Sequence, residues 1–193
     1  MNTSRVEAFS DGVLAIVITI MVLKLKTPEN LDLAGLKEIY PTLLAYILSY
    51  VYVGIYWANH HHLLAVLKTV NGKILWRNLF WLFFMSLIPT STEWMGLNPS
   101  VELPTFFYGL ILLMCAISYN ILQTEVIRVN GRDSELAERI GKDYKGKGSI
   151  LAYLIALIFA IYLPLIAYVI YVAIALLWII PDKRLEYIFY QNE

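Results

Sequence analysis

Apolar runs of roughly membrane-spanning length recur along this chain, with short polar stretches between them, and they restrict the folds open to it. The first run follows Asp11 directly and extends from Val13 to Leu23. Of the 193 residues, 59% are hydrophobic and only 16% are charged. One soluble core of this size could not bury so much apolar surface. Because a membrane helix needs about 20 mostly apolar residues, the sequence predicts an all-α integral membrane protein.

Breaks in the apolar pattern divide the chain into six expected spans within one domain, residues 1–193. Pro28, Asn71-Gly72 and Asn98-Pro99 separate the first four. Residues 150–180 would form a helix of about 46 Å, too long for a hydrocarbon core of about 30 Å, and Pro164 divides that run. Five spans are the alternative. The expected spans are approximately 5–26, 40–67, 73–95, 104–127, 149–163 and 166–181.

Lysine and arginine positions support six spans, because cytoplasmic loops of membrane proteins carry an excess of positive charge. With a cytoplasmic N-terminus, all of the 15 Lys and Arg residues except Lys24, Lys26 and Lys37 fall in cytoplasmic segments. Both termini are then cytoplasmic, and residues 128–148 form a cytoplasmic connector. We expect no cleavable signal peptide, since no small-residue cleavage site follows the first apolar run.

One face of the first span carries a stripe of branched side chains at helical spacing. At about 100° per residue, this stripe comprises Ile16, Thr19, Ile20 and Leu23, and it continues toward the N-terminus through Arg5, Phe9 and Gly12. Packing against another helix explains such a stripe, and the residues alone favour that interpretation over a pore. If several copies surrounded an axis, the stripe would instead form stacked rings that gate by dewetting.

A second feature is a set of polar residues at similar depth in the first three spans. Asp11 lies about two turns inside the first span, where a carboxylate is costly unless it has a partner or a task. We expect a buried polar cluster that clamps the first helix against the second and third, with a proton-relay or pH-sensing role as the alternative. Its expected members are Arg5, Asp11, His60 or His61, Trp76 and Asn78.

Several function classes find no support in the sequence. Adjacent histidines at 60–62 point about 100° apart on a helix and cannot converge on one ion, so no metal site is expected. The chain lacks a phosphate-binding loop, a nucleophile paired with a base and a TVGYG-like potassium filter. We therefore expect no enzymatic activity and no cofactor. The formal net charge of zero argues against a nucleic-acid partner.

Four short motifs carry a family resemblance. They are Arg5-x-x-x-Phe9-Ser10-Asp11 followed by residues 12–19, Trp57-x-x-His60-His61, Trp76-x-Asn78 and Pro89-x-x-Thr92. Together they resemble the bacterial branch of the endolysosomal, TMEM-type potassium channel family. The resemblance covers the first half of the chain closely, and the second half through span count and loop placement.

This resemblance implies a homotetramer of six-span chains around a pore lined by the first helix, in the cell (plasma) membrane. It reverses the preference for packing over pore. By position, Ile16 would form the constriction, Ile20 and Leu23 further layers, and Thr19 the hydroxyl layer that favours potassium. A structural network would hold the pore helix, comprising Arg5, Phe9, Ser10, Asp11, His60, His61, Trp76 and Asn78.

The expected function is passive, potassium-preferring cation conduction across the lipid bilayer, with potassium ions in the pore. A hydrophobic ring discriminates by dehydration and diameter, so selectivity should be modest. Two alternatives stay open. One is a proton-coupled or proton-conducting transporter that uses Asp11 and the histidines. The other is an accessory membrane protein without transport of its own.

Overall fold

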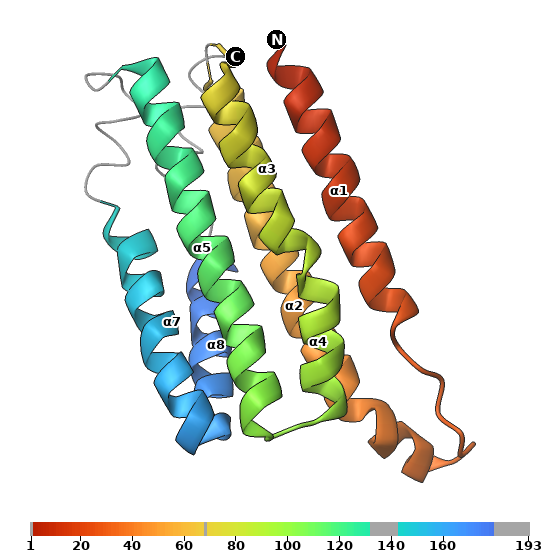
Figure 1. Cartoon of the computed structure of the whole chain (residues 1–193). Helices are drawn as coiled ribbons and strands as arrows, with labels where there is room; N and C mark the ends of the chain where they lie inside the picture. The colour runs from red at the N-terminus through yellow and green to blue at the C-terminus, as the bar shows by residue number, and fades with distance from the viewer. Residues whose placement is uncertain (1, 68, 132–142, 180–193) are drawn as a thin grey trace.

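The computed structural model describes residues 2–67, 69–131 and 143–179, and in these ranges all regular secondary structure is helical. The prediction of an all-α chain is therefore confirmed. The helices, labelled as in Figure 1, are α1 (Thr3–Leu23), α2 (Leu33–Ala65), α3 (Gly72–Ser86), α4 (Ile88–Leu97), α5 (Glu102–Asn130), α7 (Tyr144–Tyr162) and α8 (Pro164–Ile179).

Each of the six predicted ranges contains helix. Four helices, α1, α2, α5 and α7, are long and apolar enough to cross a membrane, whereas α8 is a shorter apolar helix. That the chain crosses six times stays a prediction. The middle of the predicted connector, 132–142, and the end of the last predicted span, 180–181, lie outside the described residues.

Some helix boundaries differ from the predicted span boundaries. The second helix begins at Leu33 rather than at residue 40, because Asp32 accepts hydrogen bonds from the N–H groups of Ala34 and Gly35 and caps it. Pro41 lies inside this helix. The predicted connector 128–148 is shorter than expected, since α5 continues to Asn130 and α7 begins at Tyr144.

The third predicted span is broken in the middle. α3 ends at Ser86 and α4 begins at Ile88, so the break lies at Leu87. Pro89 lacks an N–H and cannot donate the hydrogen bond that a continuous helix would need here. Three hydroxyls near the break bond carbonyl oxygens: Ser86 to Phe83, Ser91 to Ile88 and Thr92 to Ile88. Short polar side chains thus satisfy backbone groups at a helix break inside apolar surroundings.

Two apolar clusters hold the bundle together. One joins α1, α2, α3 and α5 around Trp81 and Met85. The other joins α2, α5, α7 and α8 around Tyr108 and Tyr171. In the second cluster Gly109 is required, because a Cβ at this position would overlap the hydroxyl of Tyr171 and lie 2.7 Å from its Cζ.

The first helix stands at the edge of the bundle (Figure 1), where it packs on α2, α3 and α4. Its buried side chains are spaced three or four residues apart and lie on one face: Val6, Ser10, Leu14, Val17 and Met21. The opposite face of α1 therefore meets no other helix within the described ranges, and this position determines what the first helix presents to its surroundings.

Candidate functional site

The exposed face of α1 carries the predicted stripe. Ile16 is 59% exposed and Leu23 is 78% exposed, and Phe9, Thr19 and Ile20 are exposed as well. At about 100° per residue, the centre of this stripe lies about a third of a turn from the centre of the buried face of the same helix. Among the described residues, the stripe packs against no other helix, whereas the residues alone had favoured packing against one.

Thr19 keeps its hydroxyl bonded within the helix. Its Oγ1 donates to the backbone oxygen of Ala15 at 2.8 Å, and the side chain remains exposed. The hydroxyl oxygen retains acceptor capacity on the outer face of α1.

Behind this face, three predicted polar residues form one buried hydrogen-bonded chain. Asn78 Nδ2 donates to Ser10 Oγ at 2.9 Å, and Asn78 Oδ1 lies 2.8 Å from His60 Nε2. Because the amide oxygen can only accept, His60 carries its proton on Nε2. Ser10 Oγ in turn donates to the backbone oxygen of Val6. The chain connects α1, α3 and α2 in that order.

An aromatic wall completes the surroundings of His60. Its ring stacks on Trp81 with centroids 4.6 Å apart and an interplanar angle of 17°. Both side chains are fully buried. His60 Nδ1 has no hydrogen-bond partner among the described residues. The stacking and the bond to Asn78 fix the ring orientation between α2 and α3.

Other members of the predicted cluster lie elsewhere. Trp76 is 75% exposed and Arg5 is exposed, so the expectation that they join a buried cluster was wrong. His60 bonds to Asn78 rather than to Asp11. The reason is helical geometry: Asp11 follows Ser10 by one residue and points about 100° away from the buried face.

Asp11 and its helix neighbour Glu7 instead tie α1 to the outer side of α2. Trp57 Nε1 donates to Asp11 Oδ1 at 3.1 Å. Glu7 Oε1 lies 2.6 Å from His61 Nδ1. Sequence reasoning missed Glu7, although its position one turn before Asp11 was a usable signal. Asp11 therefore has a partner, as the cost of a carboxylate in this region requires.

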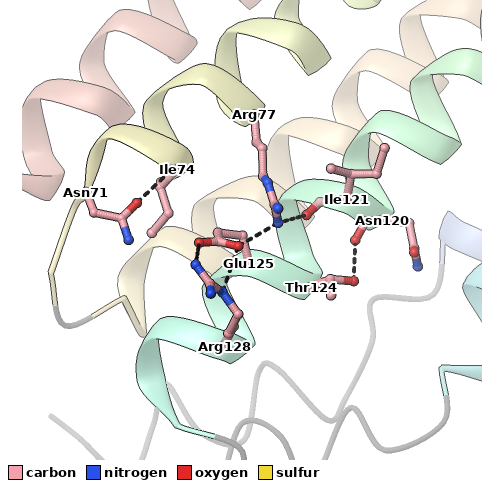
Figure 2. Close-up of polar contacts among 8 residues, drawn as sticks. All are labelled: Asn71, Ile74, Arg77, Asn120, Ile121, Thr124, Glu125 and Arg128. Atoms are coloured by element: carbon pink, nitrogen blue, oxygen red, sulfur yellow. Dashed lines mark hydrogen bonds and ion pairs between the residues drawn. The ribbon is translucent and has the colours of Figure 1, made fainter.

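A charged cluster at the opposite side of α3 also escaped the sequence analysis. Figure 2 shows Glu125 of α5 between Arg77 of α3 and Arg128. Glu125 is buried, and its Oε2 lies 2.7 Å from Arg77 Nη1 and 3.0 Å from Arg128 Nε. Arg77 also donates to the backbone oxygen of Ile121 at 3.2 Å. Two guanidinium groups compensate one buried carboxylate, so this cluster connects α3 to α5.

The described residues do not bring together three His, Cys, Asp or Glu side chains that could hold a metal ion. The arrangement around α1 consists instead of an exposed apolar face, a polar chain behind it and two side-chain links to α2. Such an arrangement fixes the rotation of one helix and leaves its outer face available to other molecules.

Comparison with known proteins gives consistent matches. The family described as "Endosomal/lysosomal potassium channel TMEM175" matches residues 5–89, which include α1, α2 and the whole polar chain. A protein of Chryseobacterium sp. (strain P1-3), named as a potassium channel, is 50% identical over 186 residues, covering 96% of this chain and 97% of that protein.

More distant matches extend this set. A Danio rerio protein named "Endosomal/lysosomal proton channel TMEM175" is 36% identical over 105 residues, covering 48% of this chain and 20% of that protein. The crystal structure of a lysosomal potassium-selective channel TMEM175 homolog from Chamaesiphon minutus superposes with a TM-score of 0.79 at 24% identity, covering 93% of this chain and 97% of that one. The fold is therefore shared, and the near-complete match to the Chryseobacterium protein shows that this chain belongs to the TMEM175 family.

Proposed function

We propose that this protein is a potassium-preferring cation channel, in which four copies surround a pore lined by the exposed face of α1. The single observation that carries the proposal is this face: branched apolar side chains and one hydroxyl lie exposed on a helix at the edge of the bundle. The proposal includes six membrane crossings, both termini in the cytoplasm and residence in the cell membrane.

The geometry of α1 suits a pore lining. Around a four-fold axis, Ile16 would contribute one ring of four isoleucines and form the narrowest point. Such a ring excludes water when closed and conducts when it widens, and it selects by ion dehydration and diameter. Thr19 would add a ring of hydroxyl oxygens next to it, and Ile20 and Leu23 further apolar layers.

The polar side chains behind α1 would then position the pore lining rather than contact ions. Asn78, Trp57 and His61 bond Ser10, Asp11 and Glu7 respectively, which lie within an arc of about 100° on one side of the helix. These links restrict rotation of α1 about its axis. A rotation of one residue, about 100°, would remove Ile16 from the pore.

Names of relatives support potassium as the permeant ion. The Chryseobacterium protein, matched over nearly its whole length, is named as a potassium channel, and so is a protein of Streptomyces collinus that is 31% identical over 137 residues. The layers formed by Ile16, Thr19, Ile20 and Leu23 are uncharged, so they provide no ring of carboxylates that would favour divalent ions.

Ion flux from liposomes tests this proposal. Potassium efflux should exceed sodium efflux in the wild type, and Ile16→Asn should raise both several-fold and reduce the preference, because a polar ring wets the constriction. Ile158→Asn is the matched control: Ile158 of α7 is 60% exposed, almost the same as Ile16, but lies on another helix. Equal effects of the two substitutions, or none for Ile16→Asn, would contradict the proposal.

Cysteine crosslinking tests the assembly separately. Cys115 is the only cysteine and is buried, so Ile16→Cys introduces the single accessible thiol. Under oxidising conditions Ile16→Cys should give disulfide-linked dimers in high yield, since neighbouring copies meet at the axis. Ile158→Cys should stay monomeric on the same gel. Monomers for both variants would place α1 away from an axis and favour an accessory role.

Proton conduction is the second candidate, and one observation favours it: the matching animal proteins are named proton channels. Acidification of a pH dye inside liposomes measures it directly. Proton flux that continues without potassium, and that Ile16→Asn does not increase, would favour this candidate over the potassium channel.

A further inference from the structure

An ion pair joins the C-terminal end of α1 to α4. Lys24, the C-cap of α1, places its Nζ 3.0 Å from Glu93 Oε2 of α4, and the two side chains are 46% and 24% exposed. Within the described residues, the other polar links from α1 to neighbouring helices start from Glu7, Ser10 and Asp11. The ion pair thus holds the end of α1 that lies about 20 Å along the helix from these links.

α4 is a firmly held partner for this end of α1. It packs on α2 and α5. Next to Glu93, Thr92 Oγ1 lies 2.7 Å from Ser49 Oγ of α2, and the same Ser49 oxygen lies 2.9 Å from the Tyr108 hydroxyl of α5. These three hydroxyl side chains are buried. The position of Glu93 is therefore set by α2 and α5, and the ion pair extends that support to α1.

The break between α3 and α4 separates two supports of α1. Asn78 on α3 holds Ser10 in the N-terminal half of α1, and Glu93 on α4 holds Lys24 at its other end. Because the helix is interrupted at Leu87, these supports belong to separate elements rather than to one continuous helix. Loss of the ion pair would therefore release one end of α1 while the polar chain still holds the other half.

The end that the ion pair holds carries the last two layers of the exposed stripe, Ile20 and Leu23. Lys24 directly follows Leu23, and successive side chains on a helix point about 100° apart. With Lys24 turned toward α4, Leu23 is therefore turned away from α4 and remains exposed. The N–H of Lys24 donates to the backbone oxygens of Ile20 and Met21 at 3.2 and 3.3 Å, so the cap is continuous with the last helical turn. The direction of Lys24 thus sets the direction of both layers.

We propose that Lys24 and Glu93 are positioning residues, which hold the Ile20 and Leu23 layers at the pore diameter that favours potassium. This inference rests on the proposed pore along α1. The pair acts through the position of the helix and not through contact with ions. A partly exposed ion pair contributes little to unfolding stability, so its loss should change conduction more than it changes the Tm.

Ion flux from liposomes tests the proposal with single variants of the full-length protein. Lys24→Gln and Glu93→Gln should each raise sodium efflux about two-fold or more and lower the potassium-to-sodium ratio, because either change releases the layers that restrict the larger pathway. Lys24→Arg keeps the charge and should behave as the wild type. Lys26→Gln, at an exposed lysine two residues further along the chain, is the matched control and should leave the ratio unchanged.

Charge reversal separates positioning from simple electrostatics. If the two side chains acted only through their charges on passing cations, Lys24→Gln and Glu93→Gln would change sodium efflux in opposite directions. The double variant Lys24→Glu with Glu93→Lys rebuilds the pair with reversed polarity and should recover the wild-type ratio. Opposite effects of the two single variants, or a double variant no closer to the wild type than either single one, would overturn the proposal.

A distance measurement tests the ion pair without relying on conduction. Spin labels on Leu23→Cys and Ile158→Cys, in labelled copies diluted with unlabelled protein, report the position of the end of α1 by pulsed electron paramagnetic resonance. Glu93→Gln should broaden the distance distribution and Lys26→Gln should not, while the Tm of both stays within about 3 °C of the wild type. An unchanged distribution in Glu93→Gln would overturn the positioning role. A broadened distribution in a protein that conducts no ions would instead contradict the proposed pore.

Discussion

The first and fifth helices of this bundle are both apolar and of membrane-crossing length, but they are used differently. In the most apolar window of α5, 56% of the residues are buried within the chain, whereas in α1 the share is 28%. α5 packs on α3, α4, α7 and α8, and α1 stands at the edge (Figure 1). α5 thus buries twice the share of its apolar window within one chain, whereas α1 leaves one face for something outside it.

The polar contacts of the two helices follow the same division. α5 is tied to α3 by a buried charged group, Glu125 with Arg77 (Figure 2). α1 is tied to α3 by the neutral pair Ser10 and Asn78. A buried ion pair is costly to separate, while neutral hydrogen bonds contribute about 1 kcal/mol each. The polar contact of α1 with α3 is thus the one that can be broken at lower cost than that of α5 with α3.

Replacing a glycine by alanine in each helix gives the largest expected difference in unfolding free energy between α5 and α1. Gly109→Ala in α5 would drive a Cβ into Tyr171 and disturb its bond to the backbone oxygen of Thr105, costing about 1–3 kcal/mol or more. A Cβ added at Gly12 in α1 has no described atom within 4 Å. The better helix propensity of alanine should offset any loss of unfolding free energy in Gly12→Ala by up to about 1 kcal/mol.

Denaturant unfolding of both variants measures this difference. If Gly12 faces a pore, Gly12→Ala should nevertheless alter ion flux in liposomes, because it narrows the exposed face of α1. Comparable stability losses in the two variants would show that α1 is as tightly enclosed as α5 and would remove the basis of the comparison.

An intermediate effect is expected from Asn78→Leu. Leucine has a similar volume but makes neither hydrogen bond, so His60 Nε2–H is left buried without an acceptor at a cost of about 1–3 kcal/mol. Asn98→Leu, at the exposed end of α4, is the control and should change the unfolding free energy by less than about 0.5 kcal/mol. Equal losses of unfolding free energy in Asn78→Leu and Asn98→Leu would mean that the polar chain does not hold α1.

Much of the fold was predictable because hydrophobicity and proline act locally. Runs of apolar residues placed helix in six ranges, and Pro164 divided the last two helices where the sequence indicated. The start of α2 was missed because Gly35, Lys37 and Glu38 interrupt the apolar run that follows its capping residue, Asp32.

The polar contacts were less predictable because they depend on helix rotation. In the run of three histidines, His60 faces α3 and His61 faces α1, a difference of one residue that sequence spacing leaves open. Glu125 and Arg77 are 48 residues apart, and their pairing depends on how α3 and α5 pack. Residue type identified Ser10, His60 and Asn78 as participants but missed Glu7 and Glu125, and the partners of all of them depend on tertiary packing.

The smallest effect is expected at the residue that the sequence marked most strongly. Asp11 is half-exposed and accepts one hydrogen bond, from Trp57. Asp11→Asn retains an amide oxygen for that bond, so the unfolding free energy should change by less than about 0.5 kcal/mol and assembly should be unaffected. Trp57→Phe removes the donor and is the matched variant. A large loss of unfolding free energy in Asp11→Asn but not in Trp57→Phe would mean that the charge of Asp11 itself holds α1. Normal assembly of Asp11→Asn with an altered pH dependence of ion flux would instead indicate that the Asp11 carboxylate titrates.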